Sequence, residues 1–183
     1  HNNADILELD GFRIGRIIGE YLLQLGHQRI AFVTSTFETK QVTRVRRLEG
    51  LRAVYEEQGL DSIKNILVCS PESELSDAKA VPEGYELGYH MAKKLIDSGK
   101  QIPTDYSVCG CDNTSVSKYK GISLTSVESY ARQTGREAID ILVRKIEAGN
   151  HLSELEDSPD GITRVEYFPK LIVRKSTGPC ENK

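Results

Sequence analysis

Segments with helical periodicity alternate with short apolar runs over the first 111 residues, and this alternation limits the possible folds more than any other feature. The first helix is predicted to begin after Asp10, a good N-cap, and to end at Gly26. An apolar strand follows at 30–33. A second helix is predicted over 43–58, before a strand at 66–69. This order predicts an α/β fold with a mostly parallel sheet and flanking helices.

The second half of the chain continues the pattern less regularly. Further elements are predicted as helices at 84–98 and 130–147 and as strands at 106–111, 124–127, 162–167 and 171–174. Polar segments at 34–42, 70–82 and 151–161 are predicted loops. Gly84 and Gly88 share one stripe of their helix, which predicts close packing against another element. The last long helix is expected to place five residues on one face: Gly135, Ala138, Ile139, Leu142 and Ile146.

The strand at 106–111 is followed directly by Asp112 and Asn113. In an open α/β sheet, ligands bind at the carboxyl ends of the strands. A carboxylate there can accept hydrogen bonds from a ligand without performing chemistry. The next segment returns to a strand instead of opening a helix, so the chain is expected to leave the first sheet here. The sequence therefore predicts a ligand cleft between two lobes.

Charge and motifs narrow the function. The 183 residues carry a net charge of −3 with mixed signs, which argues against direct contact with nucleic acid. The densest basic cluster, Arg44, Arg46 and Arg47, also fits a solvated helix start. No nucleophile–base pair, phosphate-binding glycine loop, dinucleotide fingerprint or metal-ligand cluster is visible, so we expect no catalytic residues, no cofactor and no metal.

The remaining composition predicts a cytoplasmic protein. No apolar run approaches the length of a membrane span, and the first residues lack the character of a signal peptide. The four cysteines form no C-x-x-C pair and are expected to be buried free thiols in a reducing compartment.

Seven phrases in register over nearly the whole chain resemble the effector-binding region of the lactose/galactose-repressor (LacI/GalR) family. They are Asp10-Gly11 heading a helix that runs into Leu25-Gly26-His27-Gln28-Arg29-Ile30, Arg47-Leu48-Glu49-Gly50, Gly84-Tyr85, Ile102-Pro103-Thr104-Asp105-Tyr106-Ser107-Val108, Gly110-Cys111-Asp112-Asn113, Leu124-Thr125-Ser126-Val127 and Leu171-Ile172-Val173-Arg174-Lys175-Ser176-Thr177.

This resemblance implies a periplasmic-binding-protein-like fold of type I in an incomplete two-lobe arrangement. Residues 1–112 and 165–183 would form the C-terminal lobe, and 120–160 the remaining part of the N-terminal lobe. It also implies a bacterial transcription regulator that forms a homodimer and binds a small polar effector, such as a sugar, between the lobes. DNA would be bound only through a helix-turn-helix headpiece that has no counterpart here.

The resemblance further implies that Arg47, Asp112 and Thr43 contact the effector. Arg47 suits this role because its planar guanidinium offers several donors to hydroxyls or a carboxylate. The alternatives from the residues alone are a surface arginine and an aspartate that caps a turn. A solute-binding protein of a sugar transport system is the alternative function, since it shares the fold.

One departure from the family lies between the helix at 84–98 and the turn at 102–105. The family places another strand and helix there, whereas Gly99-Lys100-Gln101 joins the two directly. Either the chain is a shortened variant or its sequence closes over missing residues. A lobe without this central unit would expose its sheet.

Overall fold

The computed structural model describes residues 4–34, 42–69, 84–121, 123–148 and 162–180, so most of the three predicted loops lie outside the described residues. The elements in chain order are β1 (Ile6–Leu9), α1 (Gly11–Gln24), β2 (Ile30–Val33), α2 (Val42–Glu57), α3 (Ser62–Asn65), β3 (Ile66–Cys69), α4 (Gly84–Asp97), β4 (Cys109–Asp112), η2 (Ser115–Lys118), β5 (Thr125–Glu128), α5 (Ala131–Ala148), β6 (Arg164–Tyr167) and β7 (Lys170–Ile172).

Local signals placed most of these elements correctly. The Asp10 side chain caps α1 by accepting a hydrogen bond of 2.8 Å from the Phe12 N–H. Gly26 follows the helix with a φ of +88°, a left-handed conformation that glycine adopts without strain. The sequence analysis missed β1, α3 and η2, all of four residues, because such short elements carry little periodicity.

The strands form three small sheets instead of one continuous sheet. β1 pairs with β6, β2 pairs with β3, and β4 pairs with β5, all in parallel, while β7 joins β5 in the antiparallel direction. The predicted mostly parallel α/β architecture is thereby confirmed. Among the described residues, β2 pairs only with β3 and β4 pairs only with β5, so each lies at the edge of its own sheet.

Helices α1 and α2 pack side by side, and glycines make this possible. A Cβ added at Gly15 would lie 1.9 Å from the Arg47 carbonyl oxygen, and one added at Gly50 would lie 1.9 Å from that of Phe12. The two backbones therefore approach more closely than any other residue would allow. Below α2, the buried side chains Leu48, Leu51, Tyr55 and Ile66 form a core cluster with the sheet of β2 and β3.

The predicted close packing of α4 is wrong at Gly88, and the surroundings of Gly84 lie outside the described residues. A Cβ at Gly88 would meet no atom within 4 Å, so this glycine faces open space. Leu87 is the one described residue of α4 that is fully buried, whereas Tyr89 and Ile96 are more than half exposed. The small-residue stripe therefore reflects no helix contact within the described part of the chain.

The face of α5 that carries Ile139, Leu142 and Ile146 is exposed in the structure. Ile139, Leu142 and Ile146 are 63%, 58% and 68% exposed, and Ile141 on the opposite side is buried. That side faces the sheet of β1 and β6, because Tyr167 donates a 2.6 Å hydrogen bond to Glu137 and Lys145 bonds Asp5 at 2.5 Å. Helix α5 thus makes its described contacts through a face that combines the polar Glu137 and Lys145 with the apolar Ile141.

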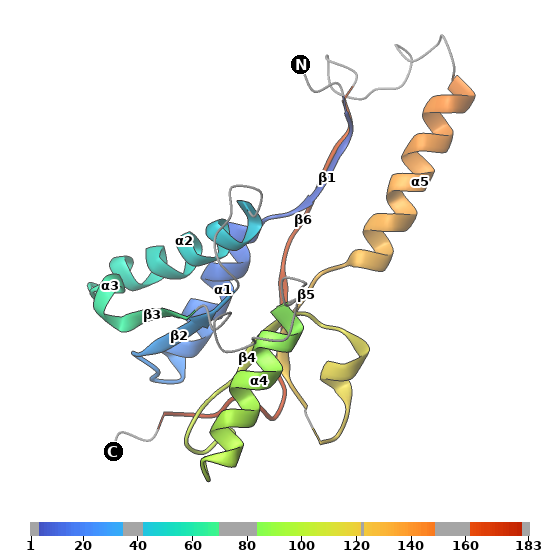
Figure 1. The fold of residues 1–183 in the computed structure, drawn as a ribbon. Coiled ribbons are helices and arrows are strands. Elements are labelled where there is room, and N and C mark those ends of the chain that lie inside the picture. The colour runs from blue at the N-terminus through green and yellow to red at the C-terminus, as the bar shows by residue number, and fades with distance from the viewer. Residues whose placement is uncertain (1–3, 35–41, 70–83, 122, 149–161, 181–183) are drawn as a thin grey trace, which may run out of the picture.

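Figure 1 shows β1 and β6 running together away from the body that holds α1, α2, β2 and β3, with α5 on their other side. β4 and β5 lie next to that body, behind α4. The strand pairings thus join β1 to β6, and β5 to β4 and β7. The lobe boundaries stated above, 1–112 with 165–183 and 120–160, stay a prediction.

Candidate functional site

A cavity of about 570 Å³ lies where β1, α1, α2, β4 and β6 meet. Thr43, Arg47 and Asp112, the three residues predicted to contact an effector, all line it. Its described lining also includes Leu7, Glu8, Leu9, Asp10, Gly11, Ile14, Val42, Arg46, Ser129 and Glu166. The structure therefore brings together side chains that are 69 positions apart along the chain, from Thr43 to Asp112. A ligand contact by any of them stays a prediction.

The glycines of α1 set the position of Thr43 and Arg47. A Cβ at Gly11 would lie 2.8 Å from the Thr43 carbonyl oxygen, and Gly15 lies against the Arg47 carbonyl. These contacts hold the first turns of α2 directly over the start of α1. Thr43 and Arg47 are one turn apart, so both side chains fall on the side of α2 that borders the cavity.

Arg47 is a half-buried cation with an unsatisfied donor. Its Nε atom is buried and has no hydrogen-bond partner among the described residues. Leaving a buried donor unpaired costs about 1–3 kcal/mol. The Arg47 charge also reaches β4: burial raises the pKa of the Cys111 thiol, and the nearby guanidinium opposes that rise.

Asp112 is the last residue of β4, at the carboxyl end where sequence analysis expected a ligand group. It is exposed, and its backbone φ of +76° lies in the left-handed region. The Ser129 hydroxyl, which also borders the cavity, donates a 3.3 Å hydrogen bond to the Asp112 carbonyl oxygen. The carboxylate itself makes no hydrogen bond or ion pair with the described residues. It is therefore able to accept hydrogen bonds from a ligand.

Acidic groups outnumber basic ones in the described lining. Asp10 and Glu166 approach Arg13 at 3.3 and 3.6 Å between oxygen and nitrogen, so one guanidinium behind the cavity offsets part of their charge. Arg46 is half exposed and lies 3.7 Å from Glu49 outside the cavity. The mixture of carboxylates, guanidinium groups and hydroxyls suits a ligand that offers both donors and acceptors, as a polyhydroxylated molecule does.

Sequence reasoning missed Glu8, Ser129 and Glu166 as cavity residues. Glu8 lies on β1, which is too short for its pattern Ile6-Leu7-Glu8-Leu9 to identify the strand. Glu166 reaches the cavity only because β6 pairs with β1 in register, with Glu8 opposite Glu166. No local pattern predicts that pairing, since the two strands are more than 150 residues apart.

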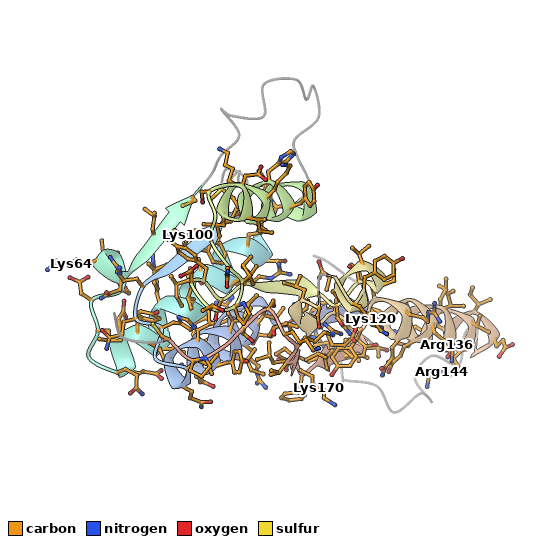
Figure 2. The ribbon with its side chains drawn as sticks, turned by 90° about the horizontal axis from the view of Figure 1, so that it is seen from below. Lys64, Lys100, Lys120, Arg136, Arg144 and Lys170 are labelled. Atoms are coloured by element: carbon orange, nitrogen blue, oxygen red, sulfur yellow. The ribbon has the colours of Figure 1, made fainter. Side chains whose placement is uncertain are left out.

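Other site chemistries find little support in the described residues. No group of three or more potential metal-ligating side chains occurs among them. The labelled basic side chains are spread along the molecule and do not form a single patch: Lys64, Lys100, Lys120, Arg136, Arg144 and Lys170 (Figure 2). Within the same described part, none of the helices combines the length and the apolar character that a bilayer crossing requires.

The cysteines are free, as predicted, but they are not all buried. Cys69, Cys109 and Cys111 are half-buried and Cys180 is exposed. The expectation for Cys180 was wrong. This residue lies near the end of the described chain, where its backbone N–H donates a 2.7 Å hydrogen bond to the Leu25 carbonyl oxygen and its side chain stays exposed. Burial raises the pKa of Cys109 to about 12.

Comparison with known proteins decides the family. The sequence model of the periplasmic binding protein-like domain matches residues 20–177. The chain belongs to the periplasmic binding protein-like domain family. Curated relatives of this domain include the HTH-type transcriptional repressor PurR of Haemophilus influenzae, 24% identical over 195 residues, which cover 95% of this chain and 54% of the repressor. The arabinose metabolism transcriptional repressor of Halalkalibacterium halodurans is 24% identical over 196 residues, which cover 97% of this chain and 50% of the repressor.

Solved structures agree with this family in fold. A LacI family transcriptional regulator of Enterococcus faecium with bound ribose superposes with a TM-score of 0.78 at 24% identity, covering 99% of this chain and 68% of the regulator. The complex of the regulator CelR with cellobiose gives a TM-score of 0.70 at 21% identity and covers 95% of this chain and 54% of that one.

These relatives confirm the predicted resemblance to the effector-binding region of LacI/GalR regulators. The periplasmic binding protein-like domain spans about half the length of the curated relatives it matches. The relatives named here are transcription regulators and not enzymes or transport proteins, so the comparisons do not favour the alternative of a solute-binding protein.

Proposed function

We propose that this chain is the effector-sensing domain of a LacI-type transcriptional regulator. It binds a small polar ligand that offers both hydrogen-bond donors and acceptors, as a sugar does, and it leaves that ligand chemically unaltered. The observation that carries the proposal is the convergence of Arg47, Asp112 and Thr43 on one cavity of about 570 Å³. A pocket of that size is within the range that holds a monosaccharide or a similar metabolite.

The chemistry of the three side chains fits recognition. The Arg47 guanidinium would donate to ring or hydroxyl oxygens, and the Asp112 carboxylate would accept from hydroxyl groups. Thr43 could do either. Ribose in the structures of two related Enterococcus regulators is a ligand of this kind.

The mechanism would be a shift between two arrangements of the elements around the cavity. The cavity is bordered by the β1–β6 sheet on one side and by α1, α2 and β4 on the other. A ligand that contacts both sides better in one arrangement stabilises that arrangement by its difference in affinity. The domain itself would perform no catalysis.

Three further features of the proposal rest on the resemblance to LacI/GalR regulators. DNA would be bound by a helix-turn-helix segment outside these 183 residues. The regulator would form a homodimer, and it would act in the bacterial cytoplasm. The ligand-induced shift would then change the spacing or mobility of the two DNA-binding segments and so repress or release transcription.

Calorimetric titration tests the ligand site. We expect ribose, cellobiose, arabinose or a purine base to bind the wild-type chain and to raise its melting temperature. Asp112→Asn and Arg47→Ala should each weaken the binding of that ligand by about 10- to 100-fold, since a hydrogen bond to a charged group contributes about 1.5–3 kcal/mol.

Matched controls come from α5. Asp140→Asn and Arg136→Ala change the same residue types at exposed positions that do not line the cavity. Both controls should bind like the wild type. Unchanged affinity in the two cavity variants would remove the assignment of the site.

A further inference from the structure

Two consecutive residues at the end of β4 hold an unfavourable backbone conformation. Asp112 has a φ of +76° and Asn113 a φ of +41°, although neither is glycine. Aspartate and asparagine tolerate the left-handed region better than other residues, but two in succession require the surrounding structure to hold them. The first of the two, Asp112, is one of the residues that line the cavity.

The side chain of Asn113 is fixed at both ends. Its Nδ2 donates a hydrogen bond of 2.6 Å to Glu128 Oε2, at the carboxyl end of the neighbouring strand β5. Its Oδ1 accepts from Arg174 Nη2 and, at 3.3 Å, from the Ser117 hydroxyl. The backbone N–H of Asn113 donates to Ser126 Oγ at 3.1 Å. Rotation of Asn113 out of its left-handed conformation would break all of these bonds.

Arg174 lies in the segment after β7 and brings a third part of the chain to this point. Its Nη1 donates to the Leu124 carbonyl oxygen and, at 3.4 Å, to the Ser117 hydroxyl. Its backbone N–H donates to Thr125 Oγ1 at 2.9 Å. A planar guanidinium can satisfy several acceptors in fixed directions at once, whereas a lysine ammonium cannot span the same set.

Neither Arg174 nor Asn113 borders the cavity, so this network is not a ligand contact. It connects the ends of β4 and β5 with the segment after β7, and the chain passes from the end of β5 through Ser129 into α5. Ser129 also bonds the Asp112 carbonyl oxygen, as described above. The orientation of Asp112 therefore depends on the segments that lead away from this sheet.

We propose that Arg174 is a positioning residue for the ligand: by fixing the Asn113 side chain, it keeps Asp112 in the left-handed conformation that places its carboxylate in the cavity. This inference rests on the proposed function, in which Asp112 contacts the ligand. It adds that a residue without any ligand contact sets the affinity of the site, and that it does so only through Asp112.

The first test needs no ligand. NMR couplings and chemical shifts of the full chain report the φ of Asp112 and Asn113 in the wild type and in Arg174→Lys. We expect both residues to leave the left-handed region in the variant, and to stay there in Lys170→Met, an exposed basic residue on β7 (Figure 2). Persistence of the left-handed pair in Arg174→Lys would overturn the proposal.

The second test is a double-mutant cycle with ribose as the titrated probe. Arg174→Lys should weaken ribose binding about tenfold in the wild-type background and less than twofold in the Asp112→Ala background. An equal loss in both backgrounds would overturn the proposal, because Arg174 would then act independently of Asp112. If the wild type bound none of ribose, cellobiose, arabinose and a purine base while the NMR result held, the ligand assignment would fail and the role of Arg174 in holding Asp112 would stand.

A second pair of variants covers the case in which Arg174→Lys does not fold. Asn113→Ala removes the side chain and leaves a residue that is strained at a φ of +41°, whereas Asn113→Gly removes it without that strain. We expect the left-handed conformation of Asp112 to persist more in the glycine variant, and ribose affinity to be several-fold higher in it than in the alanine variant. Equal behaviour of the two variants would contradict the role of backbone strain.

Discussion

Replacement of Gly15 by alanine tests the helix contact on which the cavity depends. In the structure a Cβ at this position would lie 1.9 Å from the Arg47 carbonyl oxygen and 2.8 Å from the Leu51 amide nitrogen. Ordinary contact begins at 3.4 Å, so α1 and α2 would have to separate by about 1.5 Å. The atoms in the way belong to the backbone, so no side chain can rotate to make room.

The expected cost follows from two opposing effects. Overpacking of a close contact costs about 1–3 kcal/mol, and a backbone clash belongs at the upper end of that range. Alanine gains up to about 1 kcal/mol over glycine in helix propensity. We therefore expect Gly15→Ala to lower the free energy of unfolding by about 2 kcal/mol, which corresponds to a drop of about 4–8 °C in melting temperature for a chain of this size.

Thermal and urea unfolding of Gly15→Ala measure this effect, and Gly135→Ala is the matched control. Gly135 is also within a helix, α5, but a Cβ there would meet no atom within 4 Å. The control should gain the helix propensity without the clash and be slightly more stable than the wild type. Equal stabilisation of both variants would show that α1 and α2 do not approach as closely as described.

Three other predictions concern stability and reactivity. Leu51→Ala should lower the free energy of unfolding by about 2–5 kcal/mol in urea unfolding, because Leu51 is 2% exposed in the core cluster. A hydrogen bond from Lys145 is the main cause of a lowered pKa at Asp5. The wild type should therefore be more stable than Asp5→Asn above the ordinary aspartate value near pH 3.8, and the difference should disappear as pH falls through the lowered pKa. Persistence of this stability difference at the lowest pH would exclude the ion pair between Asp5 and Lys145. A thiol reagent at pH 8 should modify exposed Cys180 first, and Cys109 should react slowly because burial raises its pKa to about 12. Mass spectrometry of the labelled chain measures this order, and faster labelling of Cys109 than of Cys180 would contradict the prediction.

Local chemistry made much of the secondary structure predictable. The Asp10 cap, the left-handed Gly26 and the apolar run at 30–33 each act through neighbours in sequence, and the structure shows all three as expected. The position of Asp112 at the end of a predicted strand marked it as a candidate, and the resemblance to a family supplied Thr43 and Arg47, which no periodicity would have selected. Their meeting at one cavity needed the folded chain, because it depends on how α2 and β4 are placed relative to each other.

Glycine spacing shows where sequence reasoning stops. Gly84 and Gly88 on α4 and the glycines of α1 share the same four-residue interval, but Gly88 faces open space whereas the glycines of α1 mark a close helix contact. A missing side chain permits a close approach but does not supply the partner. The apolar side of α5 illustrates the same limit, since periodicity identified Ile139 and Leu142 as one face but could not tell which element would cover it.

The sequence by itself determined most of the helices and strands, the Asp10 cap and the family to which the chain is similar, because these depend on residues close together or on a pattern in register. Only the tertiary structure decided that Glu8 lies opposite Glu166, that β2 and β4 lie in separate sheets, and that Arg174 reaches Asn113. The physical reason is that these contacts join segments separated by tens of residues or more. Their geometry is fixed by packing and hydrogen bonding of the whole fold, not by the conformational preference of any one segment.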